Sequence, residues 1–305
     1  MTSLDPSDSD IAPPRSRSPA RRIWRAFVGS RLAVTGLGVL LGLILLAVFG
    51  PLVVPQDPYD LMQLDVLDGQ LSPGSPSAAG YTYWLGTDDQ GRDMLSGIVY
   101  GLRTSLMVGV VSALAAAILG TSIGIFAAYR GGRIEALVMR VIDLQLSFPT
   151  ILIALMILAV LGRGVMNVVL ALVIVEWATY ARVARSVAMV ERRKEYIEAE
   201  ECLVIPRWRI LFQHLLPNCL PPLIVIATVQ TGRAITLEAT LSFLGIGVPI
   251  TEPSLGLLIA NGYQYLLSGK YWISLYPGLM LLVIILAINL VGDHLRDVIN
   301  VRRLQ

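Results

Sequence analysis

The 305-residue sequence contains little charge for its length. Asp, Glu, Lys and Arg together make up 15% of the chain, whereas soluble domains carry about 25%. Hydrophobic residues reach 55%, so the remaining polar surface is too small to cover a water-soluble globule. The composition therefore argues against a soluble enzyme, a disordered chain and a nucleic-acid-binding protein. The net charge of +2 says little by itself.

Cysteine and histidine are also scarce. Cys202 and Cys219 cannot form a disulfide framework, and no CxxC pair is present. His214 and His294 lie far apart, so neither belongs to a clustered metal motif. The patterns of zinc proteases, serine hydrolases and phosphate-binding loops are absent as well. We therefore expect no metal, no cofactor and no catalytic residue in this chain.

The sequence does have long apolar runs. A helix of about 20 apolar residues crosses the hydrocarbon core of a bilayer, and six segments approach that length. They are 32–54, 104–128, 144–161, 164–181, 215–232 (continuing towards 244) and 271–292. These runs predict an all-α, polytopic membrane protein with six transmembrane helices. Pro217, Pro221 and Pro222 crowd the start of the fifth run, where proline is tolerated.

The basic residues predict the orientation. With the N-terminus inside, 18 of the 24 Lys and Arg residues lie on one side and three lie in the opposite loops. Basic loops are retained on the cytoplasmic side, so both termini should be cytoplasmic in a multi-pass plasma-membrane protein. The predicted divisions are a partly disordered tail at 1–31, a first transmembrane helix at 32–54, an extracytoplasmic segment at 55–102, a five-helix core at 103–293 and a cytoplasmic tail at 294–305.

The inner loop at 191–214 carries two amphipathic patterns. Tyr196, Ala199 and Leu203 share one face of a predicted helix, and Pro206 suits the first turn of a second helix. Such helices could lie in the lipid headgroup layer. The first is acidic at its centre, however, and interfacial helices usually carry basic residues. The pattern therefore favours docking onto a protein partner.

The stretch EYIEAEECLVIPRWRILFQHLLPN resembles the coupling segment of ATP-binding-cassette (ABC) importer permeases, with matches that include Glu198, Ala199 and Pro217. Two positions depart from the family pattern: Glu200 replaces the usual Ala, and Val204 replaces the usual Gly. Glycine adopts a left-handed turn at little cost. Because a β-branched residue does not, we expect the turn to be built differently here.

Further motifs resemble oligopeptide/dipeptide permeases, in particular the second of their two permease subunits. These motifs are WLGTDDQGRD at 84–93, SFP at 147–149, LEATLSFLGIG at 237–247 and NLVGDHLRD at 289–297. The resemblance spans about residues 30–303 and implies the type I ABC importer permease fold. It also implies several partners: a homologous second permease subunit, two ATPases that bind the ATP, an extracytoplasmic solute-binding protein and a peptide substrate.

The resemblance assigns ATPase coupling to the inner loop. The candidate coupling residues are Tyr196, Glu198, Ala199, Glu201, Val204, Pro206 and Trp208. The solute remains open, because related permeases carry nickel, glutathione-like peptides or short saccharides. A secondary carrier is a further alternative, which the absence of an internal repeat disfavours.

Four residues within the apolar runs are candidates for the translocation path: Pro149, Glu176, Arg233 and Glu238. Charges inside a membrane are costly and often functional. Glu176 could instead pair with Arg182 or Arg140. Pro149 interrupts its span, where a kink could permit movement or merely fit the packing. Arg233 and Glu238, five residues apart, should point in different directions on a helix.

Overall fold

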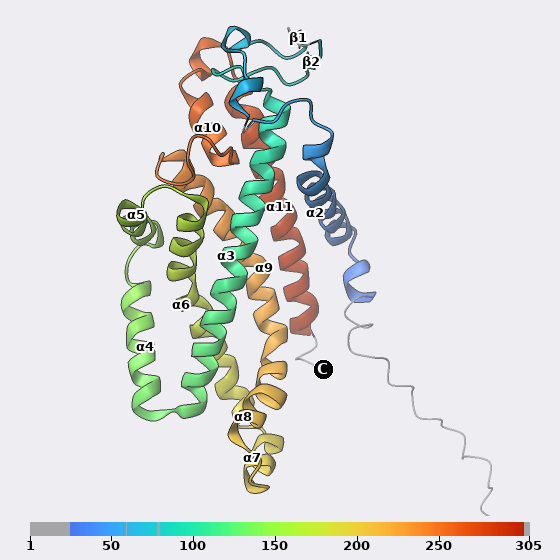
Figure 1. The fold of residues 1–305 in the computed structure, drawn as a ribbon. Coiled ribbons are helices and arrows are strands. Elements are labelled where there is room, and N and C mark those ends of the chain that lie inside the picture. The colour runs from blue at the N-terminus through green and yellow to red at the C-terminus, as the bar shows by residue number, and fades with distance from the viewer. Residues whose placement is uncertain (1–24, 59, 78–79, 302–305) are drawn as a thin grey trace, which may run out of the picture.

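The computed structural model describes residues 25–301 except 59 and 78–79, so most of the expected N-terminal tail lies outside it. The helices are α2 (Arg31–Phe49), α3 (Met94–Arg130), α4 (Gly132–Leu146), α5 (Thr150–Leu161), α6 (Val165–Arg192), α7 (Glu195–Cys202), α8 (Arg207–Arg209), α9 (Leu216–Phe243), α10 (Leu255–Tyr263) and α11 (Trp272–Val301). Strands β1 (Ser75–Pro76) and β2 (Thr82–Tyr83) pair antiparallel. Figure 1 shows the sheet and α10 at one end of the long helices and α7 and α8 at the other.

The membrane spans agree with the predicted all-α fold. Five helical segments in the described part of the chain are long and apolar enough to cross a bilayer, and the bent pair α4–α5 would make a sixth. The prediction of one kinked helix at 144–161 is wrong, because α4 and α5 meet at 89° across a break at 147–149. Proline disfavours helical geometry at the residue before it and lacks an N–H, so Pro149 starts a new helix.

Several boundaries also differ from the prediction. Helix α3 begins at Met94, ten residues before the expected start, because the Asp93 side chain accepts a hydrogen bond from the Ser96 N–H and caps it. Pro221 and Pro222 lie inside a span that runs over Arg207–Phe243 rather than at its start. Helix α11 continues through most of the expected tail at 294–305.

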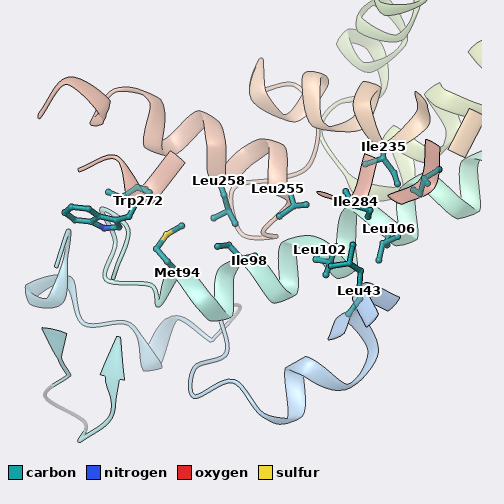
Figure 2. Packing of buried hydrophobic residues seen from close by; sticks show 13 residues of the cluster. Leu43, Met94, Ile98, Leu102, Leu106, Ile235, Leu255, Leu258, Trp272 and Ile284 are labelled. Atoms are coloured by element: carbon teal, nitrogen blue, oxygen red, sulfur yellow. The ribbon is translucent and has the colours of Figure 1, made fainter. Parts of the chain in front are cut away.

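Helix α3 lies at the centre of the molecule and packs against α2, α4, α6, α9, α10 and α11. Figure 2 shows the half of α3 nearest α10, where buried side chains from α3 meet those of α2, α9, α10 and α11. The labelled members are Leu43, Met94, Ile98, Leu102, Leu106, Ile235, Leu255, Leu258, Trp272 and Ile284. Many other apolar side chains, such as Ile118 and Val160, are exposed on the helix surfaces. That is the expected arrangement for a protein whose solvent is lipid.

Glycine brings α3 and α6 into backbone contact. A Cβ atom at Gly120 would lie 2.3 Å from the Trp177 carbonyl oxygen, and one at Gly124 would lie 2.3 Å from that of Ala181. Both distances are far below van der Waals contact. The GxxxG pair therefore sets the spacing of these two helices, as small residues do in other membrane bundles.

The segment before α3 forms a folded cap on the end of the long helices at which α10 lies. Gln56 accepts a hydrogen bond from the Asp93 N–H at 2.6 Å, and Trp272 of α11 donates to the Thr87 carbonyl at 3.2 Å. The Asp88 carboxylate accepts from the N–H groups of Gln90 and Arg92. The WLGTDDQGRD motif is thus a turn that joins the cap to the start of α3.

We expect Gly124→Ala to destabilise the protein, because its new methyl group would clash with the α6 backbone. Overpacking of this kind costs about 1–3 kcal/mol. The measurement is the thermal unfolding midpoint in detergent. Gly38→Ala is the matched control, since a Cβ at Gly38 of α2 meets nothing within 4 Å. Equal midpoints for the two variants would contradict the close contact.

Asp88 should make the cap sensitive to pH. Burial raises the pKa of its carboxyl to about 6, against the opposing effect of the Arg92 and Gln90 N–H groups. The folded cap therefore binds this proton more tightly than the unfolded chain does. Its stability should fall as pH rises from about 4 to 6, by up to about 3 kcal/mol, and then level off.

Asp88→Asn should remove the Asp88 contribution to this pH dependence and stabilise the cap at pH 7, because the amide oxygen still accepts both hydrogen bonds. Burial also raises the pKa of Asp93, which keeps its own contribution. Hydrogen exchange of residues 86–93 between pH 4.5 and 7.5 measures the effect. Asp65→Asn, at an exposed turn of the same cap, is the control. A pH profile in Asp88→Asn that is unchanged from the wild type would refute the assignment.

Candidate functional site: the inner loop and the broken helix

The loop between α6 and α9 is a compact helical segment. It consists of α7, a turn at 203–206, α8 and the π-helical turn η4 (Ile210–Leu215), which continues into α9. Ile197, Ile210 and Leu215 are buried and anchor the segment to the ends of the spans. The two short helices that the sequence predicts are therefore present, with Pro206 at the N-cap of the second.

Two polar contacts hold α7 against the start of α9. His214 Nδ1 lies 2.9 Å from a carboxylate oxygen of Glu200, and Asn218 Nδ2 donates to the Tyr196 hydroxyl at 3.1 Å. Burial raises the pKa of that hydroxyl, which keeps it neutral. We call these two contacts the α7–α9 clasp. Glu200, which stands where the family pattern has alanine, is thus a structural partner of His214.

The outward face of α7 differs from the predicted one. Ile197 is buried and Tyr196 half-buried, whereas Leu203 lies beyond the helix end and is 74% exposed. The exposed face has the spacing i, i+3, i+4, i+7 and consists of Glu195, Glu198, Ala199 and Cys202. The Glu201 side chain lies outside the described part of the structure.

Two aromatic side chains extend the exposed surface of the loop. Trp208 is 57% exposed in α8, and Phe212 is 65% exposed in η4. Large exposed apolar groups next to an acidic helix face are typical of an interaction surface.

Val204 overturns one expectation. Its φ of 57° places it in the left-handed region that the sequence analysis reserved for glycine. This conformation follows from the way α7 ends. The Ile205 N–H donates to the Glu200 carbonyl at 3.2 Å, which is the hydrogen bond of a Schellman cap that spans six residues. That cap needs a left-handed residue at position 204, whichever side chain occupies it. The conformation costs a non-glycine residue about 1–2 kcal/mol.

The break between α4 and α5 is tied to both neighbouring spans. Gln145 donates to the Ile174 and Val175 carbonyls of α6 at 2.6 and 3.0 Å. Arg233 of α9 donates to the Thr150 hydroxyl in the first turn of α5 at 3.1 Å. Pro149 is the N-cap of α5 and gives it no side-chain hydrogen bond. The structure therefore brings Pro149 and Arg233 to the same place.

Glu176 lies near this break but is enclosed. It is 2% exposed, and neither carboxylate oxygen has a hydrogen-bond partner among the described residues. The alternative pairing with Arg182 is not formed, because Arg182 binds Asp143. Arg233 is close enough to act on Glu176 electrostatically.

Glu238 lies elsewhere and is fully buried. Its two carboxylate oxygens accept hydrogen bonds from Ser105 of α3 and Ser242 of α9, both at 2.8 Å. Ser105 also accepts from the Leu255 N–H at the start of α10. Glu238 thus joins three helices inside the chain, whereas Arg233 is exposed. The two side chains point apart, as their spacing predicts.

Comparison with known proteins identifies the family. A family model described as "Binding-protein-dependent transport system inner membrane component" matches residues 120–305, and one described as "N-terminal TM domain of oligopeptide transport permease C" matches 18–73. The di/tripeptide transport system permease protein DppC of Pseudomonas aeruginosa is 36% identical over 98% of this chain and 97% of its own length. The chain belongs to the peptide permease family of ABC importers.

Other relatives and a solved structure agree with this assignment. The dipeptide permease DppC of Alkalihalophilus pseudofirmus is 37% identical over 93% of this permease, and the glutathione permease GsiD of Pectobacterium atrosepticum is 34% identical over 93%. The inward-facing MetNI methionine ABC transporter matches 67% of this permease and 97% of its own chain, at 21% identity and a TM-score of 0.55. The predicted ABC importer permease fold is confirmed, and the permease is an inner-membrane component.

The residues that position this permease's inner loop and broken helix are not among the predicted site residues. They are Gln145, Thr150, His214 and Asn218. Only the contact between Glu200 and His214 has a visible sequence pattern: Glu200 stands where alanine is usual, and His214, one of two histidines in the chain, follows 14 residues later. The other contacts join separate spans, and no local pattern reveals them.

We expect Val204→Gly to stabilise the inner loop of the permease by about 1 kcal/mol, because glycine removes the left-handed strain but adds freedom to the unfolded chain. Slower hydrogen exchange over residues 195–206 would report it. Leu203→Gly is the matched control, since Leu203 has no positive φ, and it should weaken the loop. If Val204→Gly weakens the loop as much as Leu203→Gly does, Val204 is not strained.

Proposed function

We propose that this permease is one of two homologous membrane subunits of an importer for di- and oligopeptides. Both termini are cytoplasmic, and the segment at 191–214 binds one of two partner ATPases. Those ATPases bind and hydrolyse ATP, so this chain holds no cofactor. A solute-binding protein delivers the peptide to the outer face.

The exposed face of α7 is the observation that carries the coupling role. Glu198 and Ala199 point away from the permease, while the other side of the helix is fixed to α9 by the α7–α9 clasp. A segment that is rigid on one side and open on the other can pass a partner's movement to the spans. Such coupling requires the segment to interact differently with the two states of the ATPase pair. Trp208 and Phe212 extend the apolar part of this surface.

The preference for peptide rests on the relatives. Full-length relatives that are 36–37% identical are named as dipeptide or di/tripeptide permeases. Glutathione is the second candidate, because a glutathione permease is 34% identical over a similar length. Glutathione is itself a modified tripeptide, so the two candidates share a substrate class.

For the path itself we propose the broken helix. Arg233 is exposed beside the first turn of α5, and Pro149 keeps that turn separate from α4. Glu176 would act through Arg233 rather than touch the solute. Glu238 is satisfied within the chain, so we assign it a structural part in keeping the path helices together.

Glu198→Arg should leave folding intact and abolish peptide uptake, because the reversed charge points at the ATPase surface. ATP hydrolysis by the reconstituted importer should lose its stimulation by the peptide-loaded binding protein. Arg163→Glu, an exposed charge reversal in the loop between α5 and α6, is the control and should transport normally. Normal uptake by Glu198→Arg would rule out the coupling role.

The solute is tested separately. Calorimetric titration of the partner binding protein with a dipeptide, glutathione and nickel should show tight binding of the dipeptide. Tight binding of nickel alone would reject the peptide assignment while leaving the coupling role untouched.

A further inference from the structure

Two adjoining cavities lie at the inner end of α3. The first, of about 580 Å³, is lined mainly by polar groups from the ends of α3 and α6 and from the turn after α7. The second, of about 400 Å³, is mostly apolar and is lined by the last turns of α3, by η4 and by Leu216 at the start of α9. Residues 129–130 and 210 line the first cavity, and residues 122–126 and 211–216 line the second. The two therefore follow one another along the same two elements.

The first cavity is basic. Arg130, Arg192 and Arg207 line it, and no acidic side chain does. Arg192 is fixed in place, because its Nη1 donates to the Ala128 and Tyr129 carbonyls and its guanidinium stacks on the Tyr129 ring at 5.3 Å. None of the three arginines takes part in an ion pair among the described residues.

The second cavity continues the first towards the membrane. Arg130 lies over the Phe126 ring at 5.9 Å, so this pair forms the border between the basic and apolar parts. Phe126 and Phe212 are exposed on either side of the apolar groove. Tyr129 lines the basic cavity, as expected for an aromatic residue at a membrane–water interface.

We propose that these two cavities together bind one anionic phospholipid of the cytoplasmic leaflet. Its phosphate would occupy the basic cavity, and an acyl chain would lie in the apolar groove. Guanidinium groups bind phosphate oxygens through paired, charge-assisted hydrogen bonds. The proposal uses the orientation proposed above and does not depend on peptide being the solute.

A lipid accounts for both cavities better than a protein partner does. An ATPase surface would complement the basic part but would leave the apolar cavity, which is lined by residues of the α3 span and of η4, without an occupant. Free phosphate would fill the basic part and leave the groove empty. Val204, Ile205 and Pro206 form one wall of the basic cavity, so a bound headgroup also touches the strained turn.

The test is native mass spectrometry of the complete transporter, titrated with phosphatidylglycerol, phosphatidylcholine or inorganic phosphate. We expect preferential retention of phosphatidylglycerol. Each basic group near an anionic headgroup contributes about fivefold to binding, so the double variant Arg130→Gln/Arg207→Gln should raise the Kd about 30-fold. Arg193→Gln is the matched control, because Arg193 is exposed nearby but does not line the cavity.

Two further variants separate lost charge from misfolding. Arg130→Lys/Arg207→Lys should restore most of the phosphatidylglycerol binding. Ser122→Trp should fill the apolar groove and weaken lipid binding with all three arginines present. Equal affinity of the double variant and Arg193→Gln would overturn the proposal, as would equal retention of both lipids or saturation by inorganic phosphate. So would lipid retention by the separated permease but not by the complete transporter, because the groove would then belong to a protein neighbour.

Discussion

The backbone contact between α3 and α6 at Gly120 and Gly124 is the constraint on which the rest of the architecture depends. It places two long helices side by side without intervening side chains, so their backbones are in direct contact. At the end of the helices nearest α7, Arg192 of α6 donates to the last carbonyls of α3 and adds a polar contact between the two helices. Helix α7 begins three residues later, at Glu195. The position of α7 is therefore set by packing in the membrane.

Buried carboxylates are accommodated in two different ways in the membrane. Glu238 is surrounded by serine hydroxyls that donate to both of its oxygens, so the cost of burial is offset locally. Glu176 has no such donors among the described residues and has only the nearby charge of Arg233. The hydrogen bonds of Glu238 favour a single geometry of the helices around it. The interaction of Glu176 on α6 with Arg233 on α9 depends on the distance between the two helices, so a relative movement of these helices changes its energy.

The fold class and the positions of the spans could be predicted from the sequence, because a helix in lipid must be long and apolar. The details that depend on tertiary contact could not. Pro149 marked an interruption, but the 89° turn depends on the hydrogen bonds of Gln145 and Arg233 to neighbouring helices. The start of α3 was misplaced because Arg103 ends the uncharged apolar run that predicted it, whereas the Asp93 cap begins the helix ten residues earlier.

Glu200 and Val204, the two residues of the inner loop that differ from the family pattern, both act on the same turn. The helix end at Cys202 requires a left-handed residue at position 204, and Val204 supplies it under strain. Such strain persists only where other contacts over-determine the conformation. Glu200 provides such contacts, because its carbonyl accepts the capping hydrogen bond while its carboxylate holds His214. Glutamate, where alanine is usual, therefore supports the turn that valine disfavours. The turn stays rigid because the clasp opposes its relaxation, and rigidity is what a coupling segment needs.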